Sequence, residues 1–135
     1  MITAKDILED MYRQAKGICD MTYVSERPAS TSDKMNSFIV CSLPGSLYNN
    51  EMSDDGRFDD FSCTVQFEVY VRDKTSSFNL NQPDMAKIDK VTRQLLSMFP
   101  MTGTHCTFYS PTQEMAVSDG KHFHCVIMQS KMRTR

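Results

Sequence analysis

The chain has no tryptophan, few glycines and prolines, and almost no excess charge of either sign. Its formal net charge is −2 and its pI is near 5.9, whereas a general nucleic-acid binder needs a basic stripe that displaces counterions. No apolar run approaches the ~18 residues of a membrane span, and the first residues lack a signal peptide's apolar centre. We therefore expect a cytoplasmic protein that binds neither a membrane nor sequence-specific nucleic acid.

The sequence also lacks the motifs that position reactive groups in many enzymes. Its glycines are scattered singly, so no phosphate-binding loop occurs, and no G-x-S-x-G turn is present. Catalytic geometry can be invisible in a sequence, but no motif here indicates a nucleophile, a general base or a cofactor. We expect no enzyme activity, no catalytic residue and no cofactor.

Cysteine usage gives no sign of a disulfide framework or a zinc knuckle. The five cysteines are odd in number and irregularly spaced, and no C-x-x-C pair occurs. Most of them lie in strand-like segments, where a free cysteine behaves as a small apolar residue. We expect reduced, mostly buried thiols.

The histidines form no recognisable metal motif. His105, His122 and His124 are potential zinc ligands. A hairpin tip at residues 118–120 would place His124 opposite Glu114 and far from His105. Because two neighbouring ligands do not make a structural site, we expect no metal at these residues.

Alternation of apolar and polar residues from Asp60 to Asp73 predicts a long strand with one buried and one exposed face. A nearly continuous apolar run at Ser37–Leu43 predicts a strand covered on both faces. Two further strands are expected at Thr104–Ser110 and Lys121–Ser130, joined by a hairpin. The segment Ser46–Asp60 is rich in Asn, Asp and Gly and is expected to be a long loop.

Two amphipathic helices accompany these strands. Thr3 and Asp6 form a variant of the capping box that starts the first helix, whose residue Asp10 is expected to face water. The second helix lies between Pro83 and Pro100. The chain, residues 1–135, is thus expected to be a single α+β domain, with a mostly antiparallel β-sheet and two main helices packed on one face.

Several loop and terminal residues are candidates for contacts with a partner. Apolar residues in expected loops indicate surface kept for another protein: Met52, Phe58, Phe78, Leu80, Met101, Met115 and Met132. The basic end Lys131–Arg135 either frays in solvent or meets an acidic surface, such as the acidic loop of another copy. A chain with an acidic loop and a basic end can join head to tail and close into a ring.

The order of these elements resembles the tail terminator proteins of long-tailed bacteriophages, the minor tail protein U family, and the related tail-completion proteins. The shared features are a strand, a long loop, the alternating strand CTVQFEVYVRD, the amphipathic helix DMAKIDKVTRQLLSMF and the closing strand HFHCVIMQSKMRTR. The opening helix AKDILEDMYRQAKG and the chain length also match. The resemblance covers nearly the whole chain, except Cys19–Lys34, but it is one of order and pattern.

The resemblance implies a structural, prophage-encoded protein that assembles as a ring, usually a hexamer, on the end of the tail tube. Its partners would be other copies of the chain, the tail tube and the head-connector proteins, in the bacterial cytoplasm and then in the virion. The polar face of the alternating strand and the adjacent loops would contact these partners. The expected interface residues are Glu51, Asp54, Asp55, Phe58, Asp59, Glu68, Tyr70, Arg72, Phe78, Leu80, Arg133 and Arg135.

An alternative from a different class is a small monomeric or dimeric ligand-binding domain that is not catalytic. Its ligand would be a small molecule or a hard divalent cation held by the carboxylates of the segment Ser46–Asp60. This segment lacks the fixed register of an EF-hand, which favours a solvated loop. Charge reversal at Asp54 and Asp55 separates the two hypotheses, because it would weaken assembly in one case and ligand affinity in the other.

Overall fold

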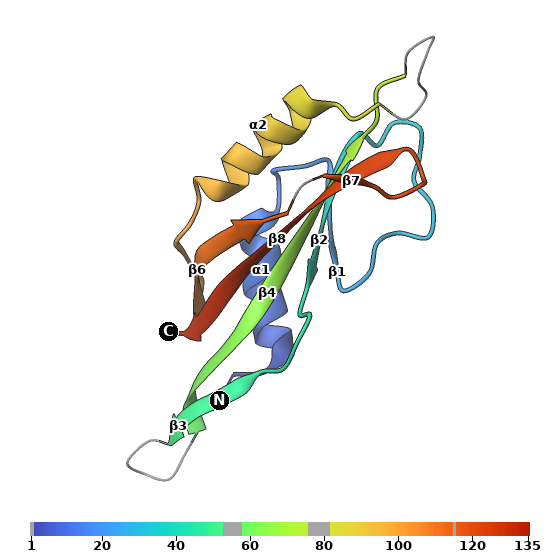
Figure 1. Cartoon of the computed structure of the whole chain (residues 1–135). Coiled ribbons are helices and arrows are strands. Elements are labelled where there is room, and N and C mark those ends of the chain that lie inside the picture. The colour runs from blue at the N-terminus through green and yellow to red at the C-terminus, as the bar shows by residue number, and fades with distance from the viewer. Residues whose placement is uncertain (1, 53–57, 76–81, 115) are drawn as a thin grey trace.

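The computed structural model of this chain describes residues 2–52, 58–75, 82–114 and 116–135 (Figure 1). In these residues two helices accompany one strongly curled, mostly antiparallel sheet of eight strands, which confirms the predicted α+β class. The elements in chain order are α1 (Ala4–Ala15), β1 (Met21–Val24), β2 (Ser37–Ser42), β3 (Tyr48–Met52), β4 (Phe58–Arg72), α2 (Met85–Leu96), β5 (Met101–Thr102), β6 (Cys106–Gln113), β7 (Val117–Ser118) and β8 (Phe123–Thr134).

The sheet is built around the long antiparallel pair of β4 and β8. Its strand order is β1-β2-β4-β8-β6-β5, while β3 pairs with β4 and β7 pairs with β8. The β4–β8 register runs from Ser62↔Arg133 to Arg72↔Phe123. Because residues directly opposite each other point to the same face of a sheet, this register assigns every side chain of both strands to one of two faces.

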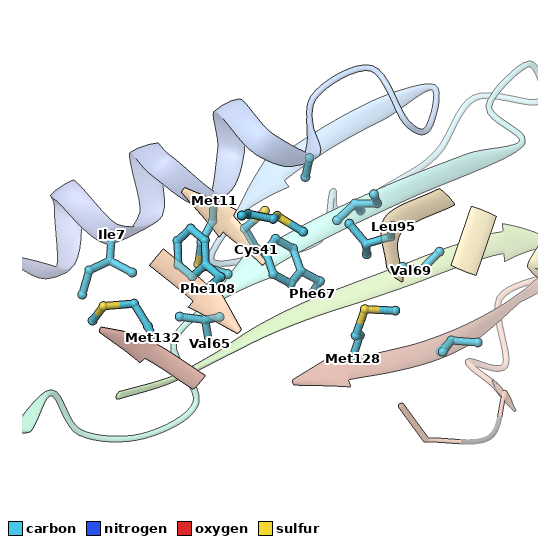
Figure 2. Packing of buried hydrophobic residues seen from close by; sticks show 14 of the residues in the cluster. Ile7, Met11, Cys41, Val65, Phe67, Val69, Leu95, Phe108, Met128 and Met132 are labelled. Carbon is cyan, nitrogen blue, oxygen red and sulfur yellow. The ribbon is translucent and has the colours of Figure 1, made fainter. Parts of the chain in front are cut away.

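The helices cover one face of the sheet and form the main core (Figure 2). From β4 the residues Val65, Phe67 and Val69 point into this core, as the alternation predicted. They meet Ile7 and Met11 of α1, Leu95 of α2, Phe108 of β6, and Met128 and Met132 of β8.

A second, smaller apolar cluster lies on the opposite face. Phe38 and Tyr70 stack with ring centroids 4.5 Å apart, and Phe123 contacts Phe38 edge-on at 5.2 Å. The segment before β2 contributes Met35 to this cluster, and Arg27 lies over the Phe38 and Tyr70 rings. The residues of β2 are therefore buried on both sides, which confirms the prediction for that strand.

The N-terminal helix begins as its sequence predicted. The Thr3 hydroxyl accepts from the backbone N–H of Asp6, and the Asp6 carboxylate accepts from the backbone N–H of Thr3 at 3.0 Å. This reciprocal arrangement satisfies two donors that helix formation leaves unpaired.

The prediction that Asp10 faces water is wrong. Asp10 is fully buried on the inner side of α1. Its Oδ2 accepts from the backbone N–H groups of His105 (2.8 Å) and Cys106 (3.0 Å), and its Oδ1 accepts from that of Thr104 (3.2 Å). The Cys106 thiol also donates to Oδ2 at 3.4 Å. The carboxylate therefore satisfies the backbone of the β5–β6 turn and ties it to α1.

The C-terminal hairpin differs from the prediction in its register. His124 lies opposite Ser118 of β7, not opposite Glu114. The reason is a wide turn organised by Asp119, whose carboxylate accepts from the backbone N–H groups of Lys121 (2.6 Å) and Phe123 (3.1 Å).

Burial of the cysteine side chains predicts that the native thiols react slowly. Burial raises the pKa of Cys41 and Cys125 to about 12, and that of Cys19 and Cys63 to about 11. Because the thiolate is the reactive form, we expect iodoacetamide at about pH 8 to label these thiols at least about a hundredfold more slowly than in the unfolded chain. Mass spectrometry of time points measures both rates, and rapid labelling of native Cys41 would contradict the expectation.

Candidate assembly surface

The hairpin of β3 and β4 extends one end of the sheet, away from α2 (Figure 1). β3 pairs with β4 from Tyr48↔Ser62 to Met52↔Phe58, whereas β8 pairs with β4 only from Ser62 onward. The prediction of a loop over Ser46–Asp60 is therefore wrong for Tyr48–Met52 of β3 and for the first residues of β4. Polar residues there form a strand because β4 supplies the backbone partners.

The outer edge of β3 has no strand beside it in the described part of the chain, where β3 pairs with β4 alone. An open edge presents backbone N–H and C=O groups to which a strand of another chain can add. The hairpin is thus suited to contacts between chains.

Exposed apolar side chains lie on both peripheral parts of this sheet. Tyr48 of β3 is 64% exposed, and its cross-strand partner Ser62 places it on the face away from the helices. Met21 and Val24 of β1, the edge strand next to β2, are 47% and 42% exposed. Met21 and Val24 point to opposite faces of the sheet, because their partners Phe38 and Cys41 belong to the second cluster and to the main core. The β1 edge therefore carries apolar side chains on both faces, and it is separate from Tyr48, as a head-to-tail contact between identical chains requires.

A polar network occupies the middle of the same face as Tyr48. The Gln129 side-chain amide donates to Gln66 Oε1 at 2.9 Å, and the Gln66 amide donates to Glu68 Oε1 at 3.2 Å. Glu68, a predicted interface residue, is partly exposed here. These hydrogen bonds join the three polar side chains into one network on the face that also carries Tyr48.

The predicted exposure of Tyr70 is wrong, and Arg72 is largely occupied within the chain. Tyr70 is only 8% exposed, because its ring stacks on Phe38 in the second cluster. The Arg72 guanidinium lies over the Phe123 ring and donates to the backbone oxygens of Met35 and Ser32. Alternation along β4 did not reveal that the segment before β2 folds over this end of the strand.

The basic C-terminal segment neither frays nor forms a separate tail, because β8 continues to Thr134. Met132 is fully buried between exposed Lys131 and Arg133, so in–out alternation persists. Arg133 reaches the Asp60 carboxylate of β4 at 3.4 Å, within the same chain. The expected attraction between acidic and basic segments is therefore present inside one subunit.

The remaining interface predictions have different positions. Arg135 is exposed and donates to the Gly103 backbone oxygen at 3.0 Å. Asp54, Asp55, Phe78 and Leu80 lie outside the described residues. For Glu51 in β3, and for Phe58 and Asp59 in β4, the structure describes the backbone strand.

Two of the methionines considered for a partner surface are core residues instead. Met101 of β5 and Met132 of β8 are buried, with 2% and 0% of their surface exposed. Met101 directly follows Pro100 and pairs with Phe108, so it enters the core at the start of a short strand. Met115 lies outside the described residues, and Met52 is a backbone partner of Phe58.

Sequence reasoning missed an acid–histidine pair at the end of β4. His124 Nδ1 lies 2.5 Å from Asp73 Oδ1, and the Asp73 side chain is 1% exposed. The backbone N–H of Asp73 also donates to the His122 oxygen at 2.8 Å. The pair fixes the ends of β4 and β8 to each other. Its two residues are 51 positions apart, so no local signal reveals it.

In comparisons with known proteins, no family model and no curated sequence matches this chain. Among the described residues, no helix has the length and apolar character needed to cross a membrane.

Proposed function

We propose that this chain is a ring-forming structural subunit that caps the tail tube of a long-tailed phage and joins the tail to the head. The observation that carries the proposal is the β3–β4 hairpin, which extends the sheet with the exposed Tyr48 ring and with an edge that no other strand of the described residues pairs. The α+β architecture with its helices on one face agrees with the order of elements that resembles the tail terminators.

The proposed contact is head to tail. The β3–β4 hairpin of one copy meets the next copy either at the sheet face away from the helices or at the β1 edge. Met21 and Val24 are exposed at that edge. Apolar side chains at two different surfaces favour a heterologous interface, and such an interface closes into a ring when the rotation between copies allows it. The partners are other copies of the chain, the tail tube and the head connector, in the host cytoplasm and in the virion.

Self-association is the first result that this proposal predicts. Light scattering behind a sizing column should show a discrete species several times the 15.5 kDa of one chain, increasing with protein concentration. Electron microscopy of that species would then count its subunits. A particle that stays at 15.5 kDa over the whole concentration range contradicts assembly through this surface.

Tyr48→Lys is expected to shift this species toward the single chain, with little change in thermal stability. The exposed ring contributes little to the subunit's own core, whereas a lysine would introduce a charge into the proposed interface. Met85→Lys is the matched control, since Met85 is 57% exposed but belongs to α2, away from the hairpin (Figure 1). Equal loss of assembly in both variants would contradict a specific role of the hairpin.

A further inference from the structure

A histidine and two carboxylates meet where α1 passes the β5–β6 turn. Asp6 and Glu9 are one helical turn apart on α1, and His105 lies between β5 and β6. The potential ligand atoms of these three side chains all lie within 4.8 Å of one another, and His105 Nε2 is 3.9 Å from Asp6 Oδ1. All three side chains are partly exposed, so an ion can reach them from solvent.

The helix cap uses one carboxylate oxygen of Asp6 and leaves the other, Oδ1, available to bind an ion. Its Oδ2 accepts from the backbone N–H and the hydroxyl of Thr3, whereas its Oδ1 is the atom nearest His105. The helix cap therefore orients one oxygen and leaves the second as a ligand.

Two hydrogen bonds hold the backbone of His105 in place. The backbone N–H of His105 donates to the buried Asp10 carboxylate at 2.8 Å, and the His105 oxygen accepts from Arg135 N–H at 3.0 Å. Both bonds fix the main chain that carries the imidazole. Lys5 competes with a metal ion for Glu9 only weakly. Its Nζ lies 3.8 Å from Glu9 Oε1, and its side chain is 83% exposed, so the ion pair contributes little.

We propose that Asp6, Glu9 and His105 bind a divalent transition-metal ion such as Zn²⁺. One imidazole nitrogen and two carboxylate oxygens suit Zn²⁺ better than Mg²⁺ or Ca²⁺, which prefer ligand sets of oxygen alone. Zinc–ligand distances of roughly 2.0–2.2 Å require the three side chains to move closer, which partly exposed side chains on a fixed backbone can do. Water completes the coordination.

A bound ion would link α1 directly to the β5–β6 turn. Because the ligands come together only in the folded chain, binding stabilises that state in proportion to the logarithm of the metal concentration. The site lies on the helix side of the sheet, so it is independent of the proposed assembly through the hairpin.

Metal-free protein titrated with Zn²⁺ provides the test. We expect heat on calorimetric titration at one ion per chain, and an unfolding temperature that rises with Zn²⁺ but not with the same concentration of Mg²⁺. Absence of both responses to Zn²⁺ would overturn the proposal, as would an equal response to Mg²⁺.

The variants locate the site. His105→Ala and Glu9→Gln are each expected to reduce the Zn²⁺ affinity at least about tenfold, since loss of an outer-shell partner alone costs roughly 10–100-fold. His122→Asn is the matched control because His122 is an exposed histidine whose φ of 72° asparagine readily adopts, and it should bind as the wild type does. Undiminished affinity in His105→Ala, or an equal loss in His122→Asn, would overturn the assignment.

Discussion

Replacing Asp10 by alanine is expected to lower the free energy of unfolding by about 3–5 kcal/mol, a large part of the stability of a domain of this size. The buried carboxylate accepts from the backbone N–H groups of Thr104, His105 and Cys106. Without it, these donors have no partner on the α1 side, and each buried unsatisfied donor costs roughly 1–3 kcal/mol. Water entering the space left by the side chain would recover part of that cost.

The β5–β6 turn packs directly against the Asp10 carboxylate. A Cβ atom added at Gly103 would lie 2.5 Å from Asp10 Cγ and Oδ2, so the turn approaches the carboxylate too closely for any larger side chain at that position. Asp10→Asn should also destabilise the fold, because its amide group would present N–H donors to backbone donors.

Urea unfolding followed by circular dichroism measures the effect of Asp10→Ala, with the m-value checked against the wild type. Asp89→Ala is the matched control, because Asp89 is an exposed helical aspartate paired with Arg93 at i,i+4. The control should change stability by no more than about 0.5 kcal/mol. A loss below about 1 kcal/mol for Asp10→Ala would show that the carboxylate is not essential to the turn.

The features that could be predicted from the sequence are those set by local pattern. The capping box at Thr3 and Asp6, the alternation of β4 and the double-sided burial of β2 each depend on neighbouring residues. Each follows from a short-range physical rule, such as unpaired helix donors or the two-residue period of a strand.

The features that could not be predicted depend on partners far along the chain. Asp10 has the polarity of a surface helix residue, and its burial depends on backbone donors 94 to 96 positions away. Strand β3 has a polar sequence, and it forms because β4 supplies its partners. The burial of Tyr70 depends on the segment before β2, whose position no periodicity encodes.

The candidate metal ligands were missed for the same reason. In the sequence, zinc binding was considered for His105, His122 and His124, and His105 lies far from Asp6 and Glu9. In the fold, the Cys106 side chain is buried against Asp10, and the imidazole instead meets carboxylates of α1. Only the packing of α1 on the β5–β6 turn creates this combination.

Arg27→Ala is expected to destabilise the fold by about 2–3 kcal/mol, because it removes a cation from an aromatic surface and leaves a buried acid without its partner. Arg27 Nη1 lies 2.6 Å from Asp119 Oδ2, whose side chain is 8% exposed. Its guanidinium also lies 4.8 Å from the centroid of the Tyr70 ring and 5.4 Å from that of Phe38. One side chain therefore fixes the segment before β2 to the turn before β8.

The geometry of the guanidinium, and not its charge alone, should matter at this position. Arg27→Lys keeps a cation but loses the planar group that lies over the rings, so it should recover only part of the stability. Arg93→Ala is the matched control, since Arg93 is a 77% exposed arginine in an i,i+4 pair, and it should cost no more than about 0.5 kcal/mol. Full recovery by lysine would contradict the proposed stacking.

The pH dependence of the Arg27→Ala effect tests the ionic part separately. Burial raises the pKa of Asp119, but hydrogen bonds from Arg27 and from the backbone N–H groups of Lys121 and Phe123 outweigh it, so the pKa lies below its ordinary value. A lowered carboxyl pKa gives stability that is complete above about pH 4 and is lost as the pH falls through the folded-state value. The stability difference between wild type and Arg27→Ala, measured by urea unfolding, should therefore be constant near neutral pH and shrink in acid. A difference independent of pH down to strong acid would assign the effect of Arg27 to ring contacts alone.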